Sequence, residues 1–215
     1  AKRWSRETFD LAVLHQVNAD VTVLSDALEF GAYRLDNADL HATVQNGVLT
    51  ADRVKGNLLG GPVNGTAVIR ADGQPTLRTD IVLSALDVAH AVKAVSGQDL
   101  AGGKLNLNVD FNASGLSPAD LVSSLAGRGD MRIGGLDVKK GGSGTALAGV
   151  IGLVSAVNQL GGLSAGGSQK GLADVGLSFA LKDGVATSND FSLTSKLGSG
   201  SGAGRVDLAA WAIDF

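Results

Sequence analysis

The chain has 215 residues, of which 44% are hydrophobic, 18% charged and 4% aromatic, with 31 glycines and no cysteine. This apolar content argues against a disordered chain, and the lack of cysteine excludes disulfides, thiolate metal sites and cysteine nucleophiles. The formal net charge of −3, with no basic run longer than two residues, argues against nucleic acid as a partner, because phosphate binding needs a basic surface.

Alternation of apolar and polar residues predicts strands that each have one solvated face. It is found in residues 19–24, 39–45, 63–70, 77–83 and 104–112. The dipeptides Asn46-Gly47, Asp72-Gly73 and Asp183-Gly184 accept positive φ angles and predict tight hairpin turns. Consecutive strands should therefore pair antiparallel, in a meander.

Helical patterns are fewer and interrupt the strands. Residues 5–17 predict an amphipathic helix, residues 87–95 one capped by Asp87, and residues 118–126 one with Ser117 as N-cap and Pro118 in its first turn. A doubly wound fold needs a crossover helix for each parallel strand, and this spacing does not provide one. The predicted fold class is mainly β (α+β): a long curved antiparallel meander sheet with one apolar face, built from repeated hairpins, with three to four short helices packed on it.

The segment 141–169 carries no charged residue. Within it, residues 145–160 place apolar side chains, Val150 and Val154 among them, at helical spacing. A transmembrane span needs about 20 apolar residues, and Asn158, Gln159 and the glycine-rich flanks argue against one here. Two interpretations stay open: a helix packed on the sheet, or an amphipathic helix facing lipid.

The chain repeats itself once, in residues 36–70 and 173–209 of what we expect to be a single domain over residues 1–215. Each copy predicts a strand, a tight turn, a second strand and then a glycine-containing strand. The matching residues are Leu40, Gly47, Val48 and Thr50 in the first copy and Leu177, Gly184, Val185 and Thr187 in the second.

The C-terminal copy and the residues after it contain a series of short motifs: Asp183-Gly184, Asp190-Phe191, Ser195, Gly202-x-Gly204, Val206-Asp207-Leu208 and Ile213-Asp214. With these motifs this region resembles the end of the AsmA family of envelope proteins. Similar features lie earlier, at Trp4-Ser5, Asp10-Leu11, Ala19-Asp20-Val21, Gly60-Gly61 to Gly65, and Leu125-Ala126-Gly127-x-Gly129. After Gly129 the chain departs from the family pattern, with a glycine-rich stretch where a strand ending in Asp-Gly and a helix start are usual.

The resemblance implies the periplasmic domain of a longer, inner-membrane-anchored protein of outer-membrane biogenesis. It also implies an antiparallel sheet curled into a groove with an apolar floor, which assists phospholipid transport between the two membranes. The alternative is a structural or assembly scaffold for outer-membrane protein or lipopolysaccharide biogenesis that carries no lipid. The expected partners are phospholipid acyl chains and envelope biogenesis proteins.

No sequence motif predicts catalysis, a cofactor or a metal, so we expect a protein that is not an enzyme. The stretch 162–166 matches the G-x-S-x-G of serine hydrolases, but all three histidines, His15, His41 and His90, precede Ser164, and no strand-to-helix elbow is predicted there. His41 and His90 are expected to be surface or hydrogen-bonded residues. The candidate lipid-facing residues are Val44, Leu105, Leu107, Val109, Val150 and Val154.

Overall fold

The computed structural model describes residues 4–30, 33–96, 101–138, 173–196, 198–210 and 212–214. The described helices are α1 (Val13–Gln16), α2 (Val88–Ser96) and α3 (Pro118–Ser123). The strands are β1 (Ala19–Phe30), β2 (Tyr33–Gln45), β3 (Val48–Leu58), β4 (Gly61–Arg70), β5 (Thr76–Asp87), β6 (Ala101–Ser114), β7 (Ala126–Val138), β8 (Ala173–Lys182), β9 (Val185–Ser195), β10 (Gly198–Asp207) and β11 (Ala212–Asp214).

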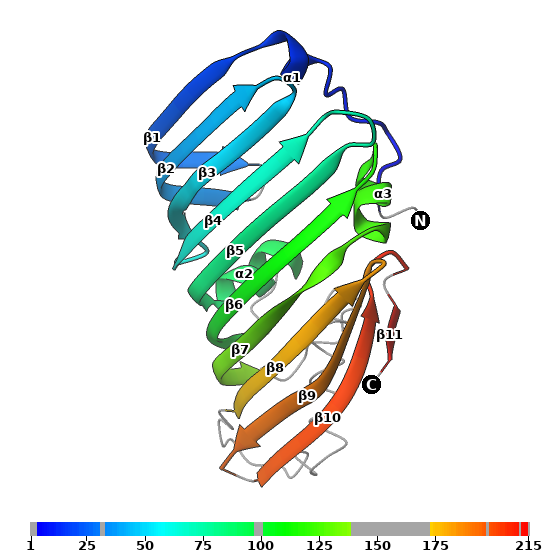
Figure 1. The fold of residues 1–215 in the computed structure, drawn as a ribbon. Helices are drawn as coiled ribbons and strands as arrows, with labels where there is room; N and C mark the ends of the chain where they lie inside the picture. Colours follow the sequence, from blue (N-terminus) through cyan, green and yellow to red (C-terminus); the bar gives the residue numbers. More distant parts are fainter. Residues whose placement is uncertain are drawn as a thin grey trace.

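The strands of the described residues form one eleven-stranded sheet whose spatial order is the order of the sequence, from β1 to β11. Every neighbouring pair is antiparallel. Figure 1 shows a long, strongly twisted sheet that runs from β1 at one end to β10 and β11 at the other. The predicted fold class is confirmed, and both copies of the internal repeat form three consecutive strands, β2–β4 and β8–β10.

Two of the three predicted hairpin turns are confirmed. Asn46 and Gly47 have φ angles of 47° and 77°, and Asp183 and Gly184 have 50° and 74°. Positive φ at both central residues defines the two-residue turn whose twist matches that of the flanking strands. Asp72-Gly73 lies instead in the longer connection between Arg70 and Thr76. The prediction of a tight turn there was wrong, because only Gly73 has a positive φ angle.

Local hydrogen bonds explain where α2 and α3 begin. The backbone N–H of His90 donates to the carboxylate of Asp87 at 3.2 Å, so Asp87 caps α2 as predicted. Ser117 and Asp120 form a reciprocal capping box at the start of α3, with Pro118 in its first turn. The N-cap of α3 was predicted correctly, but the helix ends at Ser123, and β7 already begins at Ala126.

The predicted helix over residues 5–17 is wrong: only the four residues of α1 are helical. Side chains in this segment bond locally, with Ser5 Oγ accepting from the Glu7 N–H and Asp10 accepting from the Ala12 N–H, and such bonds compete with helix formation. The backbone also bonds to other elements. The Phe9 N–H donates to the Leu116 carbonyl at 2.8 Å, and the Ser5 carbonyl accepts from the Ala119 N–H.

Residues 4–18 therefore form a largely non-helical segment that includes the short α1, here called the N-terminal strap. Figure 1 shows it passing along one end of the strands, from near α3 to α1. At its far end the Leu14 carbonyl accepts from the Gly47 N–H in the β2–β3 turn. At its near end Trp4 Nε1 donates to the Leu208 carbonyl, just after β10, at 2.9 Å.

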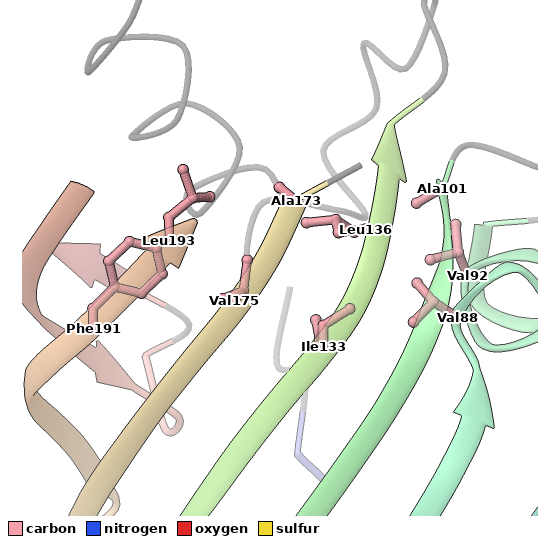
Figure 2. Packing of buried hydrophobic residues seen from close by; sticks show 9 residues of the cluster. All are labelled: Val88, Val92, Ala101, Ile133, Leu136, Ala173, Val175, Phe191 and Leu193. Atoms are coloured by element: carbon pink, nitrogen blue, oxygen red, sulfur yellow. The ribbon is translucent and has the colours of Figure 1, made fainter. Parts of the chain in front are cut away.

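The main hydrophobic cluster lies where α2 meets the ends of β6 to β9 (Figure 2). Leu105, Met131 and Leu177 pack against its margin. The cluster therefore fixes α2 to one region of the sheet. Its members are Val88, Val92, Ala101, Ile133, Leu136, Ala173, Val175, Phe191 and Leu193.

At three register shifts among the described strands, a side chain of the neighbouring strand accepts a hydrogen bond from the backbone. The Ala85 N–H in β5 donates to Asn106 Oδ1 at 3.0 Å, and the Gly135 N–H in β7 donates to Asp174 Oδ1 at 2.9 Å. Opposite the irregularity between β8 and β9, Asp190 accepts from both the N–H and the hydroxyl of Ser178. These hydrogen bonds satisfy donors that the irregular ladder leaves without a partner strand.

Candidate functional site

The strongest candidate site is the apolar face of the sheet, which the strand register makes continuous. On β6 the side chains of Leu105, Leu107, Val109 and Phe111 share this face, because residues two apart point the same way. Val109 lies beside Ile81 of β5 and Gly129 of β7. Leu107 lies beside Leu83 and Met131.

A row of small residues crosses several strands of this face. Ala42 of β2 pairs with Ala51 of β3, which pairs with Ala67 of β4, which pairs with Thr79 of β5. Larger side chains flank the row, with Val44, Leu49 and Ile69 on one side and Leu40, Val54 and Ile81 on the other. The Thr79 hydroxyl donates to the Thr66 carbonyl at 2.7 Å, so the row presents no unsatisfied polar group.

Gly129 of β7, which lies beside Val109 on this face, leaves room for a large side chain of the neighbouring strand. A Cβ atom there would lie 2.5 Å from the Phe179 ring, so the ring of Phe179 on β8 lies across the glycine. The same relation holds between Gly56 of β3 and the side chain of Leu35 on β2. Glycine at these positions lets a large neighbouring side chain lie flat against the sheet.

Much of this face is only partly covered by the described residues. Val44, Leu107 and Val109 are half-buried, and Val21 of β1 is 50% exposed. Of the predicted lipid-facing residues, Leu105 packs at the margin of the hydrophobic cluster, whereas Val44, Leu107 and Val109 lie outside it. The structure places these four on one face, and Val150 and Val154 lie outside the described residues, as does the predicted helix over 145–160.

The opposite, polar face carries a three-residue cluster centred on His41. Its Nδ1 lies 2.5 Å from Asp52 Oδ1 of β3, and its Nε2 lies 3.0 Å from Asp20 Oδ1 of β1. These hydrogen bonds raise the pKa of His41, that to Asp52 contributing most and that to Asp20 next. The expectation that His41 is a surface or hydrogen-bonded residue is confirmed, although its two partners were not foreseen.

A β-bulge explains how Asp52 reaches His41. The pairing of β2 with β3 shifts between His41 and Ala42, so Asp52 is the extra residue in β3. Its neighbour Arg53 pairs with Asp39 of β2 at 2.8 Å. The signal was in the sequence, since the consecutive charges Asp52 and Arg53 interrupt the alternation between Ala51 and Val54.

The G-x-S-x-G stretch at 162–166 lies outside the described residues. Within the described ranges, no group of His, Asp and Glu side chains could hold a metal ion. An open hollow of about 470 Å³ beside α3 is lined in part by Gln74, Leu116 and Asp120, but the carboxylate of Asp120 is committed to the helix cap.

None of the helices in the described part of the chain has the length and apolar character needed to cross a bilayer. No curated protein and no solved structure matches the chain. The AsmA family model matches residues 1–191, which include β1 to β8, the strap and the β2–β4 copy of the repeat. The chain therefore belongs to the AsmA family, a family of envelope-associated proteins.

Proposed function

We propose that this chain is a non-enzymatic module of outer-membrane biogenesis that binds phospholipid acyl chains on the apolar face of its sheet. It would assist phospholipid transport between the inner and outer membranes as the periplasmic domain of an inner-membrane-anchored protein. The observation that carries the proposal is the row from Ala42 to Thr79 with larger apolar side chains on both sides.

An acyl chain is a flexible apolar cylinder, and burying each of its methylene groups is worth about 0.8 kcal/mol. A row of small residues between two rows of larger apolar side chains would remove more of the acyl chain's surface from water than a flat apolar surface would. The half-buried state of Val44 and Val109 means that the described residues leave apolar surface to be covered. Phospholipid would lie across the strands, with its headgroup in water.

The second candidate is a scaffold in envelope assembly that carries no lipid. The hydrophobic cluster favours it, because there the same face is covered by α2 and packed with the chain's own side chains. The two functions differ in what touches the face outside the cluster.

Photo-crosslinking in cells that produce the full-length protein tests the proposal. A benzophenone amino acid is placed at Val44 or Val109 on the apolar face, and at Thr43 or Asn108 as matched controls on the polar face of the same strands. Phospholipid adducts at Val44 and Val109 but not at the controls are expected. Adducts with protein alone at the apolar positions would favour the scaffold, and equal lipid labelling at all four positions would contradict binding to one face.

A further inference from the structure

The imidazole of His41 bridges two carboxylates that come from the strands on either side of it. Nδ1 faces Asp52 of β3 and Nε2 faces Asp20 of β1, both within hydrogen-bonding distance. The ring therefore connects three adjacent strands of the polar face. One of these, β1, is the first strand of the sheet and has β2 as its strand neighbour in the described part of the chain.

The protonation state of the ring follows from its partners. Ionised carboxylates are acceptors only, and a neutral imidazole has a single N–H to donate. Both hydrogen bonds form together only when both ring nitrogens carry a proton. Because the carboxylates lie on opposite sides of the ring, they do not converge on one point as the ligands of a shared metal ion would.

The charged groups around the ring favour the protonated form. Asp20 and Asp52 are 75% and 60% exposed, whereas the side chain of His41 is 21% exposed between them. Arg53, directly opposite His41 on β3, is paired with Asp39, and Lys55 lies beside Asp39 in the strand register. The group directly opposite His41 on β1 is the uncharged Thr22.

We propose that His41 is a proton-dependent clamp that ties β1 to β3 across β2, closed when the imidazole is charged and open when it is neutral. The pKa of His41 is raised in the folded chain by its bonds to Asp52 and Asp20. A raised pKa means that the stabilisation is complete below the unfolded value of about 6.5 and is lost as the pH rises through the folded value. Alkaline conditions therefore loosen the β1 end of the sheet and leave the hydrophobic cluster unaffected.

Two measurements test the clamp. Nitrogen-detected NMR titration of the imidazole should give a His41 midpoint above about 6.5, and the midpoint should fall in Asp52→Asn and in Asp20→Asn. Hydrogen exchange of β1 peptides, corrected for the intrinsic pH dependence of exchange, should show protection that is lost above the midpoint.

The matched variants are His41→Gln and His90→Gln. His41→Gln keeps a polar side chain without a titrating charge and should abolish the pH dependence of β1 protection, whereas His90→Gln on α2 should leave it intact. Asp52→Asn distinguishes the clamp from a merely structural histidine, because it keeps the size of the side chain and removes the charge. A His41 midpoint at or below about 6.5, or unchanged pH dependence in His41→Gln, would overturn the proposal.

Discussion

Val109 and Asn112 lie on the same strand but on opposite faces of the sheet. Val109 is half-buried between Ile81 and Gly129, whereas Asn112 is exposed opposite Arg78. A carboxylate at position 109 would lose hydration among apolar side chains, but one at position 112 would stay in water beside a cation. The effect of an introduced carboxylate on the free energy of unfolding should therefore depend on the face of the sheet that carries it.

We expect Val109→Asp to lower the free energy of unfolding by roughly 1–3 kcal/mol, the cost of an unpaired buried polar group. Asn112→Asp should change it by no more than about 0.5 kcal/mol, as is usual for surface substitutions. Urea unfolding of both variants beside the parent measures the difference. An equal decrease in the free energy of unfolding in both variants would contradict the assignment of one apolar and one solvated face.

At the scale of elements, the β-bulges are held by side chains rather than by the strand ladder alone. Asp174 reaches across from β8 to the Gly135 N–H in β7, where Gly135 has a φ angle of 62°. The carboxylate oxygen takes the role that a carbonyl of the partner strand would have in a regular ladder. Its hydrogen bond should contribute to stability although Asp174 is exposed.

Asp174→Ala should destabilise the chain by about 1 kcal/mol, the usual net value of one hydrogen bond. Asp174→Asn keeps an acceptor oxygen and should restore most of the loss. Asp80→Ala, on the same polar face, is the control, because Asp80 lies opposite Asp110 and its removal relieves a like-charge pair. Thermal melts of the three variants measure these changes in stability. If Asp80→Ala lost as much stability as Asp174→Ala, the proposed role of the Asp174 hydrogen bond would be contradicted.

The order of the strands could be predicted from the sequence, whereas most of the irregularities in their pairing could not. The alternation of apolar and polar residues in 104–112 indicates directly which side chains lie on each face of the strand. The dipeptide Asn46-Gly47 likewise indicates a tight turn at its own position. Ala85 and Gly103, in contrast, have positive φ angles at register shifts that depend on the neighbouring strand. The partners of His41 come from two other strands, so they could be found only after the register was known.

The conformation of the N-terminal strap was predicted wrongly for a related reason. Residues 5–17 have the periodicity of a helix, but the hydrogen-bond partners of the segment, Leu116 and Ala119, lie far along the chain. Tertiary bonds of this kind override a weak helical preference. Only the contacts of the whole molecule decide the conformation of such a segment.

At the scale of the whole molecule, the strap connects elements that the sheet keeps far apart. It bonds to the turn between β2 and β3 through Leu14, to the β6–α3 connection through Phe9, and to the end of β10 through Trp4. A strap held this way should resist proteolysis and protect the turns beneath it. Its attachment should depend on these hydrogen bonds, most of which involve the backbone of the strap, rather than on side-chain volume.

Phe9→Pro removes the N–H that donates to the Leu116 carbonyl, so we expect faster hydrogen exchange and proteolysis over residues 4–18. Phe9→Ala keeps that donor and loses a ring that is 39% exposed, and it should behave more like the parent. Exchange mass spectrometry of the two variants makes the comparison. If residues 4–18 exchanged as fast in the alanine variant as in the proline variant, packing of the Phe9 ring, rather than its backbone hydrogen bond, would hold the strap in place.

The strictly sequential order of the strands makes the sheet extensible. Neighbouring strands lie about 4.8 Å apart, so eleven of them span about 48 Å, and each inserted hairpin would lengthen the sheet by about 10 Å. Insertion would disrupt pairing only at the point of insertion, because each described strand pairs only with the strands that come before and after it in the chain. Duplication of a unit such as β2–β4 would thus change the distance that one chain can reach while leaving its cross-section the same.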